Sequence, residues 1–202
     1  MSENVCSVRR AGGTNGKGTV FYESLVWCVG GGVSGGKCLY RFYLFFGKGT
    51  GYERLLNEIY ATVRDNWDAD RLMGLGLVAM PEYYGDKSLE NIGFALMDLN
   101  GDGIDELVVG TSAPVEGANV VFCVYENPVE PFYFINSVEG YTYYLHESEA
   151  EGTYTAERMG TDRAFAICPA EEVGVIDFDV LEGAMDPAGR LILEMIPFAH
   201  FK

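Results

Sequence analysis

The sequence of 202 residues is poor in histidine and in basic residues. It contains two histidines, and 14 lysines and arginines stand against 30 aspartates and glutamates, so the formal net charge is −16. The histidines, His146 and His200, are far apart and leave little material for a histidine-based metal site or a Ser-His-Asp triad. His146 ends a tyrosine-rich run and is expected at the surface. The strong negative charge argues against nucleic acid as a partner, because its phosphates would be repelled.

The sequence also lacks an export signal, a membrane span and a paired-cysteine metal motif. No apolar run of the needed length follows the N-terminal residues, so no signal peptide is visible. Charged residues interrupt every apolar window of about twenty residues, which excludes a transmembrane helix. The five cysteines have no pairwise metal spacing. Cys123 and Cys168 fall in predicted strands, and they are expected as buried thiols or as one cross-strand disulfide.

Charge and glycine are unevenly distributed along the chain. Residues 1–50 hold six basic and two acidic residues, whereas residues 51–202 hold eight basic and 28 acidic ones. Eleven of the 26 glycines also lie in the first segment, which includes the linker-like run Gly30–Gly36. Such asymmetry indicates a boundary. We therefore predict that residues 1–50 are a poorly ordered tail, or a stretch foreign to the domain, and that residues 51–202 form a single helix-plus-β domain.

An amphipathic helix is predicted at the start of the second segment. Thr50 and Glu53 have the spacing of a capping box, and Thr62 falls on the polar face of the helix that follows. A second short helix is expected from Asp68 to Leu75. The apolar residues that recur at the helical period of the first helix are Tyr52, Leu55, Leu56, Ile59, Tyr60 and Val63.

Short strand patterns with turn residues between them fill most of the remaining chain, at a spacing of about ten residues that is typical of an antiparallel meander. The predicted strands are Gly93–Leu99, Leu107–Val109, Val120–Tyr125, Phe132–Ser137, Tyr141–His146, Thr153–Arg158, Arg163–Cys168, Val173–Val180 and Arg190–Ile196. The predicted fold class is therefore α+β and mainly β, with an antiparallel meander and an N-terminal amphipathic helix packed on it.

The most informative stretch connects the first two of these strands. Its oxygen-bearing side chains are Asp98, Asn100, Asp102 and Glu106. Gly103 lies where a tight loop must bend, and Ca²⁺ takes about six to eight hard oxygen ligands, commonly including a backbone carbonyl such as that of Ile104. The twelfth position counted from Asp98 is Val109, which cannot replace the chelating glutamate of an EF-hand. The unit is therefore predicted as strand, loop, strand.

This segment resembles the calcium loop of FG-GAP-type β-repeats, which occur in integrin propellers and in many bacterial surface proteins. The resemblance implies that Ca²⁺ is bound by the four side chains just named and by the carbonyl of Ile104. It is confined to one loop, so it does not imply a propeller, which needs several blades. More loosely, the chain from about Tyr52 onward resembles secreted or lipid-anchored domains of unknown function from Gram-positive gut bacteria. The alternative for the loop is a plain hairpin turn, because Asn-Gly and Asp-Gly both favour hairpins.

The function expected from these features is that of a non-enzymatic β-module stabilised by structural Ca²⁺. Its expected location is extracellular or at the cell surface, with an extracellular partner or a glycan as its ligand, and a cytoplasmic location is the fallback. Two alternatives stay open. A carbohydrate- or adhesion-type module would use aromatic side chains at Trp67, Tyr83 and Tyr84. A carboxylate-based hydrolase would use two of the carboxylates of the acidic segment, which include Glu147, Glu149, Glu151, Glu171, Glu172, Asp177, Asp179, Glu182 and Asp186.

Overall fold

The computed structural model describes residues 7–14, 20–27, 51–126, 133–147, 154–167, 180–182 and 185–201. The chain divides into two compact units, Met1–Gly49 and Thr50–Lys202. In the first unit, β1 (Ser7–Thr14) and β2 (Val20–Trp27) pair antiparallel. The sequence boundary predicted at residue 50 lies next to this division, and the poor order predicted for residues 1–50 stays a prediction.

The described residues of the second unit form a nine-stranded antiparallel sheet. The spatial order is β10-β9-β8-β7-β5-β4-β3-β11, with β6 paired to β5, so most neighbours in space are also neighbours in the chain. The predicted class, α+β and mainly β with an antiparallel meander, is confirmed. The strands are β3 (Ile92–Met97), β4 (Glu106–Thr111), β5 (Val121–Tyr125), β6 (Tyr133–Ile135), β7 (Tyr143–Glu147), β8 (Tyr154–Arg158), β9 (Arg163–Ile167), β10 (Val180–Glu182) and β11 (Ile196–Pro197).

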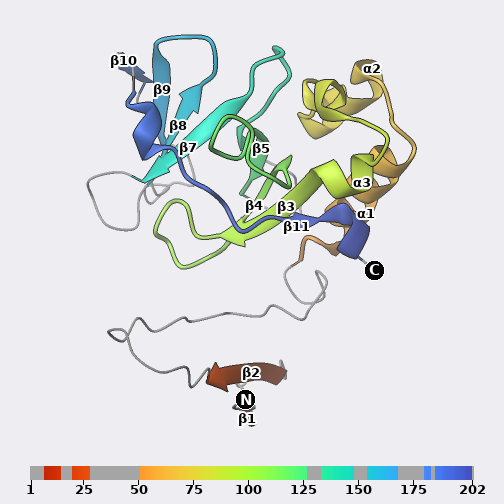
Figure 1. The fold of residues 1–202 in the computed structure, drawn as a ribbon, viewed down its shortest axis with the longest axis vertical. Coiled ribbons are helices and arrows are strands. Elements are labelled where there is room, and N and C mark those ends of the chain that lie inside the picture. The colour runs from red at the N-terminus through yellow and green to blue at the C-terminus, as the bar shows by residue number, and fades with distance from the viewer. Residues whose placement is uncertain are drawn as a thin grey trace, which may run out of the picture. The chain divides into compact units, whose positions relative to one another are not determined.

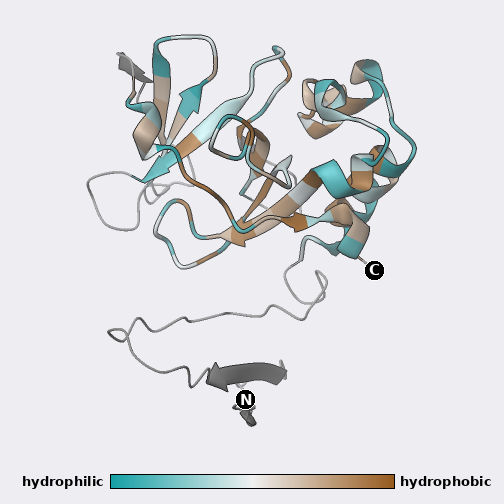
Figure 2. Ribbon diagram, in the orientation of Figure 1, coloured by the Kyte–Doolittle hydropathy of each residue, from teal (hydrophilic) through white to brown (hydrophobic). Residues whose placement is uncertain are grey.

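Helix α1 (Glu53–Arg64) packs on one face of this sheet, as predicted, and α2 (Ala69–Leu72) and α3 (Ser88–Asn91) lie on the same side (Figure 1). The apolar side of α1 and one face of the strands share a core. The ribbon of β3 is mainly hydrophobic, whereas the helices carry both hydrophilic and hydrophobic residues (Figure 2). Four short 3₁₀ helices complete the described unit: η1 (Met73–Leu75), η2 (Met80–Tyr83), η3 (Pro187–Gly189) and η4 (Phe198–His200).

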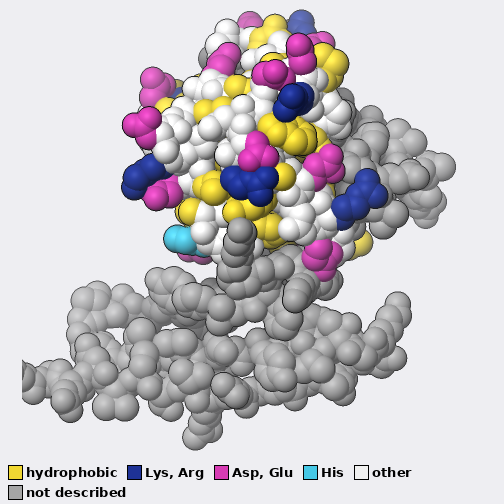
Figure 3. Space-filling view, turned by 90° about the vertical axis from the view of Figure 1, so that its right-hand side faces the viewer, with side chains coloured by type: hydrophobic (Ala, Val, Ile, Leu, Met, Phe, Trp, Pro, Cys, Tyr) yellow, Lys and Arg dark blue, Asp and Glu magenta, His cyan; other side chains and the backbone are white. Residues whose placement is uncertain are grey.

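The helical side of the second unit carries side chains of both charges. Basic and acidic residues are interspersed there among apolar ones (Figure 3). Two ion pairs belong to these helices, Arg64–Asp65 at 2.7 Å and Lys87–Glu90 at 2.9 Å. Pairs this exposed contribute little to stability, so the packing of α1 depends on its apolar face.

Two details of α1 differ from the sequence prediction. The residue at the N-cap is Tyr52, without a capping side chain, rather than the predicted Thr50. Thr50 itself lies outside the described residues, so its predicted capping box with Glu53 stays a prediction. Instead, the Tyr52 hydroxyl lies 2.9 Å and 2.7 Å from the carbonyl oxygens of Tyr125 and Glu126 and ties the helix start to β5. Thr62, predicted on the polar face, is fully buried. Its hydroxyl donates to the Glu58 carbonyl at 2.8 Å, which satisfies it within the helix.

The other predicted elements agree with the structure except near the C-terminus. Seven predicted strands correspond to β3 through β9, with ends that differ by no more than two residues, and the helix predicted from Asp68 to Leu75 is α2 followed by η1. Most of the predicted strand Val173–Val180 lies outside the described residues, and Val180 begins β10. The predicted strand Arg190–Ile196 is wrong, because within it only Ile196 joins a strand, β11.

A second core lies on the face of the sheet opposite α1. Alternate residues of the strands face it, among them Ala95, Val108, Val124 and Leu145, and Leu193 of the C-terminal segment packs against them. Because both faces are covered, β4 and β5 are buried along their whole length. This is why their sequences are nearly continuous apolar runs rather than strict alternations.

Candidate functional site

The predicted strand-loop-strand unit is a hairpin between β3 and β4. The two strands pair antiparallel, and Met97 and Glu106 are the last opposed residues before the loop. Gly101 and Gly103 have φ angles of +77° and +84°, in the left-handed region that side chains disfavour. The two glycines therefore allow the chain to reverse direction within the loop.

Carboxylate and amide oxygens of the loop accept hydrogen bonds from the loop's own backbone. Asp98 accepts through Oδ1 from the Gly101 N–H at 2.8 Å and through Oδ2 from the Gly103 N–H at 2.9 Å. Asp102 accepts from the Ile104 N–H at 2.7 Å, and Asn100 accepts from the Asp102 N–H at 3.0 Å. Such side-chain turns are a common use of aspartate and asparagine in loops. These hydrogen bonds stabilise the observed conformation of the loop.

Glu106 differs from the other predicted ligands because it is a fully buried carboxylate. Its Oε2 accepts a hydrogen bond from the Leu99 N–H at 2.7 Å. Its Oε1 is also buried and has no hydrogen-bond partner among the described residues. A buried carboxylate oxygen without a donor is costly, and a proton or a bound cation would each remove that cost.

The surroundings of Glu106 disfavour its negative charge. Burial is the main cause that raises the pKa of Glu106 to about 7, and the charges of Asp102 and Asp98 raise it further. The hydrogen bond from the Leu99 N–H acts in the opposite direction. Near neutral pH this carboxyl group is therefore close to its own protonation midpoint.

The other predicted ligands lie at different depths. Asn100 is fully buried, Asp98 is half-buried and Asp102 is exposed. The Asn100 amide also donates to Asp102 Oδ2 at 3.2 Å. Within the described ranges, no group of three or more His, Cys, Asp and Glu side chains is arranged to hold a metal ion. The predicted set of Asp98, Asn100, Asp102, Ile104 and Glu106 stays a prediction, in which an amide and a carbonyl oxygen supplement three carboxylates.

The aromatic residues considered for carbohydrate binding pack against the helix-side core. Trp67, Tyr83 and Tyr84 are all partly buried against it. The Tyr83 ring lies 5.0 Å from the ring of Phe122, measured between centroids. Burial raises the pKa of Tyr84 to about 12, and its hydroxyl has no hydrogen-bond partner in the described part of the chain. Their arrangement favours a packing role over an exposed binding surface.

A buried ionic cluster was not predicted from the sequence. His146, expected at the surface, is 3% exposed, and its Nε2 lies 2.8 Å from Oε2 of Glu157. Arg190 donates to both oxygens of the same carboxylate, at 2.8 Å and 2.7 Å. These contacts, with Arg190 the largest cause, lower the pKa of Glu157. The only sequence signal was a glutamate inside a predicted strand, which did not indicate its partners.

The structure describes some of the cysteines and carboxylates named in the sequence analysis, and others lie outside the described residues. Cys123 is a free thiol in the core, and burial raises its pKa. Cys168 lies outside the described residues. Asp186 caps η3 by accepting from the Ala188 N–H at 3.0 Å, and Glu147 lines a groove beside the C-terminal segment. The candidate acidic residues that lie outside the described ranges are Glu149, Glu151, Glu171, Glu172, Asp177 and Asp179.

Comparisons with protein families, with curated proteins and with solved structures found no match for this chain. None of the described helices is long and apolar enough to cross a membrane. No activity can therefore be transferred from a relative, and function is inferred from the chain's own residues.

Proposed function

We propose that the loop of residues 98–106 binds Ca²⁺ and that the ion stabilises this chain as a non-enzymatic β-module. The observation that carries the proposal is the buried Oε1 of Glu106, which lacks a donor among the described residues. A bound cation would satisfy this oxygen while the carboxylate stays ionised. The nearby charges of Asp98 and Asp102, which disfavour a bare Glu106 carboxylate, would be offset by the same ion.

The donor set matches the chemistry of calcium. Carboxylates of Asp98, Asp102 and Glu106, the amide oxygen of Asn100 and the carbonyl oxygen of Ile104 are all hard oxygen donors, and water can supply further ligands. Ca²⁺ tolerates irregular coordination better than Mg²⁺, which demands near-ideal octahedral geometry. The ion would supply positive charge, and the chain would supply a loop already bent by its two glycines of positive φ.

We place the module outside the cell or on its surface. Extracellular modules bind calcium with dissociation constants of about 10⁻⁴–10⁻³ M. At roughly ten times its dissociation constant, the ion would add about 1.4 kcal/mol to the free energy of unfolding. For a domain of this size that corresponds to a rise of roughly 3–6 °C in Tm.

Thermal unfolding with calcium and with chelator tests the proposal. We expect calcium to raise the Tm of the natural chain and magnesium to raise it less. Asp102→Ala should lose the calcium response, whereas the matched control Asp86→Ala, which changes an exposed aspartate on another loop, should keep it. Equal Tm values with calcium and with chelator, together with no heat of calcium binding by titration calorimetry, would overturn the proposal and leave the loop as a plain hairpin turn.

A further inference from the structure

The sheet of the second unit is interrupted between β5 and β7. These neighbouring strands are paired only at Val121 and Tyr143. Beyond that point the C-terminal segment takes the place of a neighbour for β7. Its Arg190 forms an isolated bridge with His146, and the Leu191 N–H donates to the Leu145 carbonyl at 2.8 Å.

The same segment is held on its other side by Asn119, whose Oδ1 accepts from the Leu193 N–H at 2.8 Å. Arg190 is fixed in addition by its two hydrogen bonds to Glu157. The segment is thus anchored to both parts of the interrupted sheet. This explains why an apolar run with the pattern of a strand does not form one.

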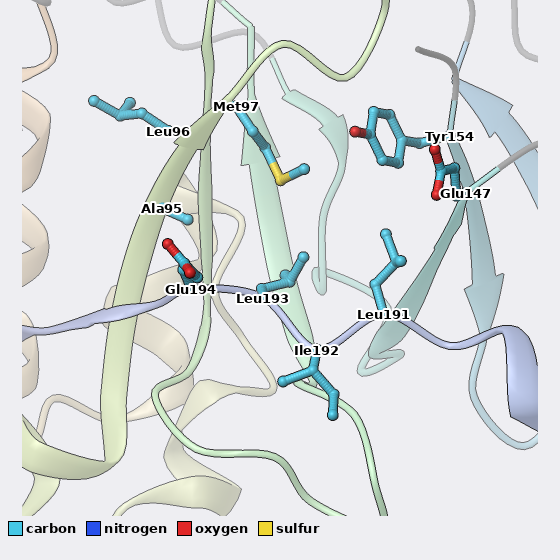
Figure 4. Close-up of a pocket in the computed structure, with 9 residues that line it drawn as sticks. All are labelled: Ala95, Leu96, Met97, Glu147, Tyr154, Leu191, Ile192, Leu193 and Glu194. Atoms are coloured by element: carbon cyan, nitrogen blue, oxygen red, sulfur yellow. The ribbon is translucent and has the colours of Figure 1, made fainter. Parts of the chain in front are cut away.

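A groove of about 300 Å³ lies where the C-terminal segment crosses the sheet. Met97 from β3 and Leu191 and Leu193 from the segment point toward one another in it (Figure 4). Tyr154 of β8 stands beside them with its hydroxyl directed toward the side of Met97 (Figure 4). The volume is at the small end of the range of ligand-binding pockets, and the middle of the groove is apolar.

Two carboxylates line the groove at its opposite ends. Glu194 lies near the β3 side, and Glu147 lies beside Tyr154 (Figure 4). Both are exposed, and neither forms an ion pair with a residue of the described chain. Burial raises the pKa of Tyr154, and the negative charges of Glu147 and Asp98 near its hydroxyl raise it further.

From this arrangement we infer that the groove binds a linear aliphatic diammonium ion, the chemistry of a polyamine. Each ammonium group pairs with one carboxylate, Glu147 at one end and Glu194 at the other. The methylene chain between them lies on Met97, Leu191 and Leu193 and removes their apolar surface from water. An anionic ligand is excluded by the two carboxylates, and a single cation satisfies only one of them.

The groove and the proposed calcium site share no lining residue. None of the residues that line the groove is a predicted calcium ligand. Asp98, a predicted calcium ligand, directly follows the groove residue Met97 in the chain. Calcium at the loop would reduce the negative potential at the Glu147 end, so binding is measured at saturating calcium and again with chelator.

The test is a titration of the full chain with unbranched diamines from diaminopropane to diaminooctane. Calorimetry measures the affinity, and the NMR signal of the Met97 methyl group reports binding in the groove. We expect an affinity maximum at one chain length, because the two ammonium groups of the ligand must reach both carboxylates at once. A monoamine of the same carbon number should bind about fivefold more weakly, because it forms one exposed ion pair fewer. The diol of the same length should bind more weakly still.

Variants separate the site from general attraction to an acidic protein. Glu147→Gln and Glu194→Gln should each bind the diamine and the monoamine with equal affinity, while the control Glu82→Gln, an exposed glutamate on η2, should keep the preference for the diamine. In chelator, Asp102→Ala should bind the diamine as the natural chain does, although the variant has lost the calcium response. Tm values of all variants verify that they are folded.

Two results would overturn the inference. Affinity that does not depend on diamine length and does not change in either groove variant would mean counter-ion attraction to a chain of net charge −16. If a lysine-rich peptide binds strongly at these residues and diamines do not bind, the groove is a protein-docking surface instead.

Discussion

Glu106 has one carboxylate oxygen bound to the Leu99 N–H and one without a donor in the described structure. Its pKa lies at about 7, above the ordinary 4.5. A raised folded-state pKa of an acid means that the folded state binds the proton more tightly than the unfolded state. In calcium-free protein the stability should therefore fall as the pH rises from about 4.5 to about 7, and then level off.

Glu106→Gln removes this charge while keeping the shape of the side chain. Without calcium, we expect the variant to be more stable than the natural chain above neutral pH, by on the order of 2 kcal/mol. It should also lack the natural pH slope and gain nothing from calcium. Urea unfolding in chelator, at mildly acidic and at mildly alkaline pH, measures the difference. A variant less stable than the natural chain at alkaline pH would contradict the cost assigned to the buried Glu106 charge.

Arg190→Met tests the buried cluster of His146, Glu157 and Arg190. The change leaves the Glu157 carboxylate, whose side chain is 11% exposed, without its strongest partner. We expect the free energy of unfolding to fall by about 3 kcal/mol. The double change Arg190→Met with Glu157→Gln should cost less, because no buried charge is then left unpaired, and Arg54→Met on the exposed face of α1 should cost little. Equal losses in the single and double variants would contradict an ionic role.

The cluster of His146, Glu157 and Arg190 should also make the stability of the chain depend on pH in the acid range. The pKa of Glu157 is lowered by Arg190, so its contribution to stability is present above the ordinary pKa of 4.5 and is lost as the pH falls through the lower folded-state value. The natural chain should therefore lose stability in acid more steeply than Arg190→Met does. Urea midpoints followed from neutral pH into acid report this slope.

Among the elements, the pairing of β4 with β5 depends on a glycine. The register shifts between Val109 and Gly110, and a β-carbon at Gly110 would clash with the carbonyl oxygen of Val120. Gly110→Ala forces the backbone of the central strands apart, so we expect a loss of about 3 kcal/mol. Gly74→Ala is the matched control, because a β-carbon there meets nothing within 4 Å. Thermal melts of the two variants make the comparison, and similar Tm values would contradict it.

Local patterns predicted elements well where neighbours in the chain are also neighbours in space. The apolar period of α1 and the rhythm of β3 through β9 both arise from short-range geometry. The segment after Arg190 has an equally apolar pattern, yet it crosses the interrupted sheet instead of extending it. Its partners, Asn119, Leu145 and Glu157, are more than thirty residues away in the chain, and no local pattern contains that information.

For the molecule as a whole, both core clusters are built from residues between Tyr52 and Phe201. We therefore expect a chain of residues 50–202 to unfold cooperatively at nearly the Tm of the full chain and to keep the calcium response. Circular dichroism melts of both chains, with calcium and with chelator, test this. Failure of the shorter chain to fold would show that the first unit contributes to the stability of the second.

The sequence by itself determined the class of fold, the hairpin around residues 98–106 and the chemistry of its side chains, because turns, helical periods and strand alternation are local. It identified Asp98, Asn100, Asp102 and Glu106 as one group but not their unequal burial. Only the tertiary structure decided that Glu106 lies in the core with an oxygen that no described donor reaches, that His146 is buried against Glu157, and that Glu147 and Glu194 stand at the two ends of one groove. These facts depend on which distant segments pack together, and packing is settled by the whole core at once.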